Sequence, residues 1–269
     1  MDAVSNAKNL PDAGLSVSRM PGHWLLARAG KRVLRPGGVE MTRRMLAELH
    51  IGASDRILEF APGLGDTAAR LAEYDPFSYT GVDRDPAATR QLRDRFAARD
   101  WMRFVQGSAE QTVEPSESAT VVIAEAMLSM HSAEVKQQIV AEAARLLAPG
   151  GRYGIHELCL LDAGRKAELE RALSREIHSG IRLLTPPEWK ALLAGAGFSV
   201  RTEFFSPMHL LEPRRVLQDE GILRTLGILL HLAGDAETRA RVLSMRRVFT
   251  QHARELGAIC LIARKGTLL

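Results

Sequence analysis

The stretch Ile57-Leu-Glu-Phe-Ala-Pro-Gly-Leu-Gly65 sets the architecture we expect, because an apolar strand pattern runs directly into two glycines. Asp66 to Tyr74 follows with a helical pattern, and a second apolar run ends at Asp83, eighteen residues beyond Gly65. Glycines at the carboxyl end of a first parallel strand let a ligand approach the backbone, and the next helix offers free N–H groups. An acid that closes the second strand has two oxygens for the hydroxyls of a ribose. These positions predict a nucleoside site.

Strands and helices continue to alternate downstream, which predicts a parallel sheet covered on both faces. The two last strands need no parallel crossover, so we expect an antiparallel edge. The expected fold class is α/β: a Rossmann-like, doubly wound, mostly parallel seven-stranded sheet with an antiparallel last strand. The elements expected after Asp83 are a helix at 86–99, strands at 102–106 and 119–124, a helix at 134–147, a strand at 152–156, a helix at 185–194, and strands at 198–205 and 258–264.

Two helix starts carry specific signals. Asp85 is a good N-cap with Pro86 at the first helical position. Thr185 and Glu188 form a predicted capping box.

The domain organisation we expect is a single domain over 21–269 after a flexible tail at 1–20. Within it, 21–50 supplies N-terminal helices, and 213–256 is a helical insertion that we interpret as a substrate cap. Its apolar and arginine-rich faces suit association, including a homo-oligomer, equally well.

Composition narrows the function classes. The 269 residues are 46% hydrophobic and 25% charged, as in ordinary globular proteins, and no apolar run reaches the roughly 18 residues of a membrane span. Cys159 and Cys260 lie in apolar runs without metal-ligand spacing, so we expect no metal and a reducing, cytoplasmic location. The net charge of +4 is spread among acids, which favours solvated helix faces over a nucleic-acid surface.

Charge distinguishes two ligands for the glycine loop. Gly63-Leu-Gly65-Asp-Thr-Ala68 also fits the dinucleotide pattern, but a pyrophosphate would face Glu59 and Asp66, with no basic residue in the loop. S-adenosylmethionine carries an ammonium and a sulfonium, which nearby acids favour. We therefore expect S-adenosyl-L-methionine as cofactor, with an NAD-dependent oxidoreductase as the alternative.

The chain resembles class I S-adenosylmethionine-dependent methyltransferases of the ubiquinone/menaquinone biosynthesis type over about 56–265. The resemblance implies methyl transfer from S-adenosylmethionine to a small-molecule acceptor. The matching segments are the acidic glycine loop with Glu59, Gly63 and Gly65, the second-strand Gly81-Val-Asp83, the adenine-bordering Gln106-Gly-Ser-Ala-Glu110, the fourth strand and turn at 121–130, Arg145-Leu-Leu-Ala-Pro-Gly-Gly151, and 185–198.

Two positions depart from the family pattern. Ala61 replaces the usual first glycine, which narrows the space near the methionine moiety, and Ser108 stands where an aspartate commonly contacts the adenine. The candidate cofactor-binding residues are Glu59, Ala61, Gly63, Gly65, Asp83, Arg84, Ser108, Ala109 and Glu125.

Catalytic candidates lie after the fourth strand and at the end of the fifth. Glu125 and His131 follow the fourth strand, and His156 closes the fifth, on the same rim. Histidine is a natural general base near neutral pH, although a lone histidine is more often structural. The sequence leaves two roles open for Glu125: it positions or deprotonates a nucleophile, or it hydrogen-bonds the helix that follows.

Three other functions remain open besides methyl transfer to a small molecule. They are an NAD-dependent oxidoreductase, a non-catalytic cofactor-binding or interaction module, and an RNA-modifying enzyme suggested only by the basic charge. The Asn/Asp-Pro-Pro-aromatic motif of amino-group methylation is absent from the sequence, which disfavours nucleobase methylation.

Overall fold

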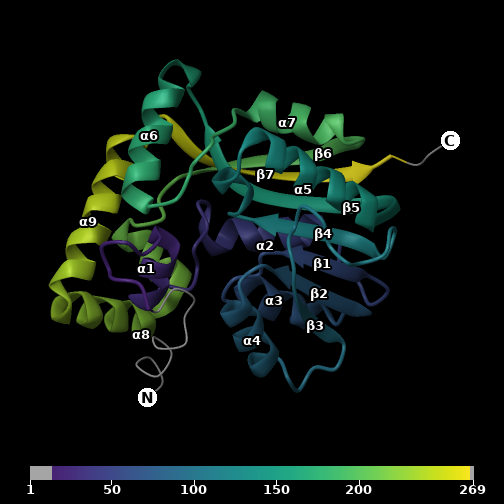
Figure 1. Ribbon diagram of the computed structural model, residues 1–269, viewed down its shortest axis with the longest axis horizontal. Coiled ribbons are helices and arrows are strands. Elements are labelled where there is room, and N and C mark those ends of the chain that lie inside the picture. Colours follow the sequence, from purple (N-terminus) through teal and green to yellow (C-terminus); the bar gives the residue numbers. More distant parts are fainter. Residues whose placement is uncertain (1–13, 267–269) are drawn as a thin grey trace.

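A computed structural model describes residues 14–266 and shows one seven-stranded sheet in the order β3-β2-β1-β4-β5-β7-β6 (Figure 1). Strands β1 to β5 pair in parallel, and β7 is antiparallel to both of its neighbours. The strands are β1 (Arg56–Phe60), β2 (Ser78–Asp83), β3 (Met102–Gln106), β4 (Ala119–Glu125), β5 (Leu147–Leu160), β6 (Phe198–Pro207) and β7 (Leu256–Lys265). The predicted fold class is confirmed.

The two C-terminal strands form the expected antiparallel edge region of the sheet, with β7 inside and β6 outermost. β7 inserts between β5 and β6 and is buried from Leu256 to Ala263. Its run of apolar residues fits this position, because a strand covered on both faces needs no polar alternation. β6 is the edge strand, and its side chains alternate between core and solvent at several positions.

Helices cover both faces of the sheet. On one face, α2 (Gly38–Glu48), α3 (Asp66–Leu71) and α4 (Pro86–Arg95) bury a core that includes Met45 and Leu92. On the other face, α5 (Ala133–Leu146) and α7 (Pro186–Gly195) bury Ile139 and Trp189. Short 3₁₀ turns lie at Ala72–Tyr74, Leu128–Met130 and Ala163–Arg165.

Both predicted helix caps are present. Asp85 accepts hydrogen bonds from the backbone N–H groups of Ala87 and Ala88, at the start of α4. At the start of α7, Thr185 and Glu188 form the reciprocal capping box. Each cap satisfies N–H groups that have no partner inside the helix, so the sequence alone locates these two helix starts.

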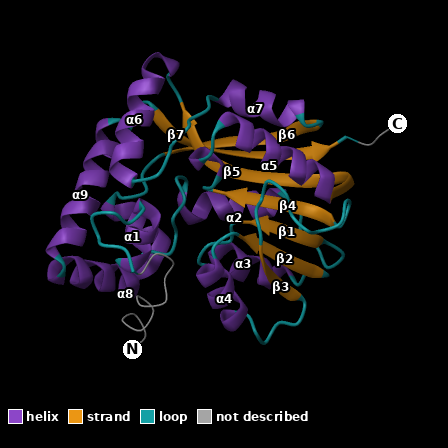
Figure 2. Ribbon diagram, viewed as in Figure 1, coloured by secondary structure: helices purple, strands orange, loops and turns teal. Residues whose placement is uncertain are grey.

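Four helices form a separate layer beyond the carboxyl ends of the parallel strands (Figure 2). They are α1 (Gly22–Arg28), α6 (Lys166–Ile177), α8 (Pro213–Gly234) and α9 (Ala236–Gln251), and we call this layer the cap. The cap has a core of its own, which includes Leu25, Leu173 and Met245. The expected helical insertion is thus present, whereas α6 was not predicted. Of the helices within 14–266, none has the length and apolar character to cross a membrane.

The flexible tail expected at 1–20 includes residues that belong to the folded cap. Residues 1–13 lie outside the described part of the chain, but Val17 and Met20 are buried in the cap core. Arg241 of α9 donates hydrogen bonds from Nη1 to the backbone oxygens of both residues, at 2.5 and 2.7 Å. The segment 14–20 is therefore part of the folded cap.

Candidate active site

The glycine loop lies at the switch point between β1 and β4, where the chain crosses from one side of the sheet to the other. Gly63 and Gly65 have φ values of +55° and +72°, which glycine adopts without strain. A Cβ on Gly65 would lie 2.5 Å from Leu92 Cδ2, so this glycine is also needed for close packing of α4. A Cβ on Gly63 meets nothing nearer than Ala61 O at 3.9 Å, so the space in front of Gly63 is open for a ligand.

Ala61 takes the place of the family's first glycine and keeps the glycine conformation, with φ of +50°. Ala126, immediately after β4, has φ of +54°. Non-glycine residues rarely adopt this region, and such strain gathers at ligand sites. Both strained residues lie at the carboxyl ends of the two strands that flank the switch point.

Asp83 is held in place against the glycine loop. Its carboxylate accepts the N–H of Gly63 at 3.2 Å and the N–H of Asp85 at 2.9 Å. Burial raises the pKa of Asp83. Because each carboxylate oxygen has a second acceptor site, the geometry leaves capacity for two ribose hydroxyls. The neighbouring Arg84 is exposed.

Glu59 occupies a different environment from the one expected. Its carboxyl is buried and accepts a hydrogen bond from the Tyr79 hydroxyl at 2.6 Å. Burial raises the pKa of Glu59 to about 8 against the effect of that hydrogen bond. Glu59 is therefore largely protonated at neutral pH and does not present a negative charge to the loop.

Glu125 is the centre of a buried polar network. Its carboxylate accepts hydrogen bonds from Thr42 at 2.6 Å, from His156 Nδ1 at 2.8 Å and from the Thr67 hydroxyl. Arg35 Nε lies 3.5 Å away, and the Glu125 side chain is only 4% exposed. Burial acts to raise its pKa, but Arg35 and then His156 lower the pKa of Glu125 to about 2. Glu125 is thus a paired anion that joins α2, α3 and β5.

His156 is fully buried, with both ring nitrogens engaged. Nε2 accepts the backbone N–H of Gly37 at 3.0 Å, while Nδ1 faces Glu125. A neutral ring that accepts at Nε2 carries its proton on Nδ1 and has no nitrogen left for a substrate. The geometry therefore does not support the prediction that His156 is a general base, and it assigns the residue to positioning the loop before α2.

The remaining predicted residues lie at different depths: Ala109 is buried, and Ser108 and His131 are half-buried. Burial and the charge of Arg84 lower the pKa of His131, which is half-buried at the end of the 3₁₀ turn after β4. The Ser108 hydroxyl donates to Glu110, and Ala109 packs into the core under β4.

Sequence reasoning missed the basic residues around the glycine loop. Arg35 Nη1 lies 3.1 Å from Asp66 Oδ2, and Arg95 Nη1 donates to the backbone oxygens of Leu64 and Gly65 at 2.5 and 3.2 Å. The loop contains no basic residue in the sequence, but in the folded protein two arginines from distant segments lie against it, so the prediction that the loop has no basic neighbour is wrong. The Arg35-Pro-Gly-Gly38 break was visible in the sequence, but its distance from the loop hid the contact.

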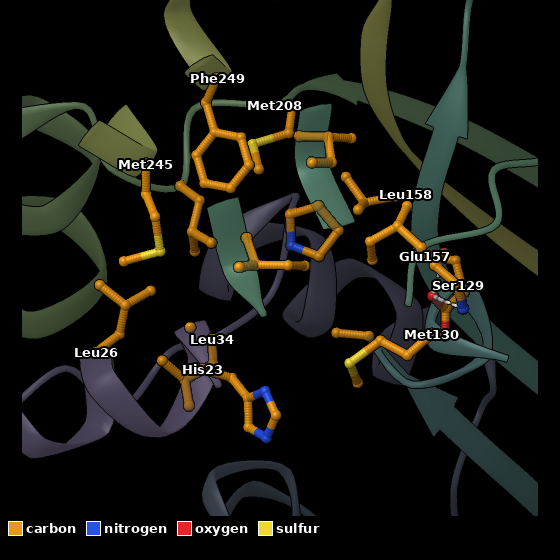
Figure 3. A pocket seen from close by; sticks show the side chains of 17 residues that line it. His23, Leu26, Leu34, Ser129, Met130, Glu157, Leu158, Met208, Met245 and Phe249 are labelled. Carbon is orange, nitrogen blue, oxygen red and sulfur yellow. Dashed lines mark hydrogen bonds between the residues drawn. The ribbon is translucent and has the colours of Figure 1, made fainter. Parts of the chain in front are cut away.

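A mostly apolar cavity lies between the cap and the ends of β4 and β5 (Figure 3). It includes Leu26 and His23 from α1, Met245 and Phe249 from α9, and Ala126 beside the switch point. Burial lowers the pKa of His23 to about 4, so this ring is neutral near pH 7. The cavity thus reaches from the cap to the same sheet edge as the glycine loop.

Glu157 supports one wall of this cavity. It accepts the backbone N–H groups of Met127, Leu128 and Ser129 and the Ser129 hydroxyl, between 2.7 and 3.1 Å. These bonds satisfy the carboxylate, whose pKa burial nevertheless raises. The residue therefore shapes the turn after β4.

Comparison with known proteins agrees with this fold. Residues 57–151 match the methyltransferase domain family. A Haemophilus influenzae protein of uncharacterised function is 32% identical over 247 residues, covering 91% of this chain and 98% of that protein. The 27-O-demethylrifamycin SV methyltransferase of Amycolatopsis mediterranei is 29% identical over 168 residues, which are 61% of each chain.

A solved structure shares the fold at low sequence identity. The geranyl diphosphate C-methyltransferase of Streptomyces coelicolor, solved with Mg²⁺, geranyl diphosphate and S-adenosyl-L-homocysteine, superposes with a TM-score of 0.62 at 14% identity. The match covers 84% of this chain and 78% of that one.

The fold and the sequence matches define a Rossmann-like methyltransferase. The methyltransferase domain at 57–151, together with the curated methyltransferases that match the chain, identifies it as a class I S-adenosylmethionine-dependent methyltransferase. The resemblance to the ubiquinone/menaquinone subtype stays a prediction.

Proposed function

We propose that this enzyme binds S-adenosyl-L-methionine at the glycine loop and methylates an apolar small molecule held in the cap cavity, by in-line displacement. The observation that carries the proposal is that the cavity reaches Ala126, which directly follows β4, the strand next to the glycine-loop strand β1. Donor and acceptor sites therefore open at one sheet edge.

The residues present fit the cofactor. The open space before Gly63 accommodates a ligand against the backbone, and Asp83 has acceptor capacity for a ribose. Ala61 and Gly65 shape the loop, while Arg84, Ser108 and Ala109 border the adenine side. When bound, S-adenosylmethionine supplies an electrophilic methyl group.

The chain's own contribution is orientation and the exclusion of water. The Glu125 network holds the loop before α2 against β4 and β5. The cap places mostly apolar side chains around the acceptor, and positioning of this kind accounts for a large share of the rate in group transfer. His23 gives the acceptor a neutral imidazole to hydrogen-bond. Glu125 and His156 act as positioning residues, and His131 remains the candidate group on the rim.

Labelled methyl transfer tests the acceptor class directly. The protein would be incubated with methyl-labelled S-adenosylmethionine and a bacterial cell extract, which is then separated into small-molecule, RNA and protein fractions. We expect label in the organic-soluble small molecules. Label confined to RNA or protein would overturn the proposal.

A cavity variant tests where the acceptor binds. Met130→Trp narrows the cavity, and Val113→Trp places the same side chain on an exposed site outside it. We expect Met130→Trp to lose labelling but to retain binding of S-adenosylhomocysteine in calorimetry, and Val113→Trp to retain both. Equal labelling by both variants would place the acceptor elsewhere.

A further inference from the structure

The second half of α8 exposes a face of large apolar side chains. Helix α8 is broken at Gly221, where φ is +74° and ψ is +170°, and then continues to Gly234. Five side chains beyond this break are between 52% and 87% exposed, and we call them the α8 apolar face: Ile222, Leu223, Leu226, Leu229 and Leu230.

The spacing of these residues is that of one helix face. Positions 222, 226, 229 and 230 follow the i, i+4, i+7, i+8 pattern that normally faces a protein core. Here that pattern faces solvent, while Ile228 on the opposite side is buried near Gly30. Contiguous exposed patches of this kind mark interaction sites, because water-exposed leucine carries a free-energy cost.

Arginines border the α8 apolar face. Arg32 and Arg224 meet at one carboxylate: the backbone N–H of Arg32 donates to Glu220 Oε1 at 2.8 Å, and Arg224 Nε lies 3.6 Å from Glu220 Oε2. Burial, and then repulsion from Arg224 and Arg95, lowers the pKa of Arg32, which agrees with three neighbouring guanidinium groups. Their acidic neighbour Glu220 is almost fully buried and also accepts the backbone N–H groups of Arg32 and Val33. The surface beside the leucines is therefore positive.

We propose that the α8 apolar face and the Arg32–Arg95–Arg224 cluster dock on an anionic lipid bilayer. The leucines would enter the headgroup–acyl boundary while the arginines pair with lipid phosphates, as in interfacial amphipathic helices. The segment after Gly221 spans 13 residues, too short to cross a bilayer, so it lies in the plane of the interface.

Charge complementarity favours a lipid surface over a second copy of the chain. A two-fold dimer centred on α8 would bring two arginine clusters together at its rim, and like charges facing each other oppose association. An anionic bilayer presents the opposite charge. If the proposed function holds, this location also suits the supply of a lipophilic acceptor, because Gly30, two residues after the cavity-lining helix α1, packs near Ile228 of α8.

Vesicle co-sedimentation tests this surface without any activity measurement. Full-length protein would be mixed with vesicles of phosphatidylcholine alone and with vesicles that also contain phosphatidylglycerol. We expect binding to the anionic vesicles only, falling as salt is added. Leu223→Glu with Leu230→Glu should weaken it at least about tenfold, since two exposed apolar anchors become acids.

Matched variants control for general surface effects. Val113→Glu changes a residue that is 85% exposed elsewhere and should bind like the wild type. The double variant Arg32→Gln with Arg224→Gln should bind anionic vesicles more weakly. The control double variant on α6, Arg171→Gln with Arg175→Gln, should bind them like the wild type. Thermal melts by circular dichroism would show that each variant is folded.

Three results would overturn the inference. The first is no binding to anionic vesicles, and the second is equal binding to neutral vesicles. The third is that the wild-type protein is a dimer, that the double variant Leu223→Glu with Leu230→Glu is a monomer, and that neither protein binds vesicles. The last result would assign the α8 apolar face to contact between copies. None of these outcomes bears on methyl transfer, so the proposed function is tested separately.

Discussion

His156 and Glu125 face each other across β5 and β4, with 2.8 Å between Nδ1 and Oε1, while His156 Nε2 accepts the N–H of Gly37. This chain of hydrogen bonds ties the segment before α2 to the carboxyl ends of two central strands. Glu125 and His156, which the sequence predicts as catalytic candidates, therefore position the segments that surround the site. Their substitution should affect the stability of the fold.

Removing Glu125 should destabilise the fold strongly. In Glu125→Ala, Arg35 stays buried with one of its two carboxylate partners missing, and Thr42, Thr67 and His156 lose their shared acceptor. Breaking a buried pair in this way costs about 3–5 kcal/mol. Urea unfolding monitored by circular dichroism measures the loss. Glu73→Ala, at an exposed position, should change stability by less than about 0.5 kcal/mol. Equal effects of both variants would show that the network adds nothing.

Glu59 should make the folded protein less stable as pH rises. Its pKa is raised from 4.5 to about 8, so between these values the unfolded chain releases a proton that the folded protein keeps. The free energy of unfolding from this group therefore falls from about pH 4.5 to about pH 8. Glu59→Gln keeps an acceptor for the Tyr79 hydroxyl but cannot ionise, so its unfolding free energy should vary less over that range. Urea titrations at several pH values check this, and an unchanged pH slope would contradict the buried, protonated state.

Loss of the Asp83 carboxylate should weaken cofactor binding. Asp83→Ala removes the acceptors proposed for the ribose, and charged hydrogen bonds of this kind contribute about 1.5–3 kcal/mol, or roughly tenfold to a hundredfold in affinity. Calorimetric titration with S-adenosylhomocysteine measures the change. Asp94→Ala, an exposed acid on α4, is the matched control and should bind like the wild type. If Asp83→Ala binds normally, the ribose lies elsewhere.

Two glycines with nearly the same φ should respond differently to alanine. Gly65 and Gly150 have φ of +72° and +73°, but only a Cβ on Gly65 would collide with Leu92. Each substitution costs about 1–2 kcal/mol for the left-handed backbone. Gly65→Ala should lose more stability than Gly150→Ala because α4 must also move, and chemical denaturation of both variants gives the difference. Equal losses would mean that α4 adjusts freely.

Local patterns were enough to predict the elements around the site. The glycine loop, the Asp83 position and the caps at Asp85 and Thr185 depend on residues close together in the sequence, whose backbone preferences act within one turn. Helix α6 was missed because its apolar residues follow no strong start signal, and its N-cap residue Arg165 makes no side-chain capping bond.

The sequence by itself determined the order of strands and helices apart from α6, the positive-φ loop and the acid that closes β2, because these follow from local conformational preference and hydrophobic periodicity. Only the tertiary structure decided the charge of the site. It buried Glu59 against Tyr79, brought Arg35 to Asp66 and Glu125, and engaged both nitrogens of His156. Burial and charge pairing depend on which distant segments pack together, and no pattern within one segment contains that information.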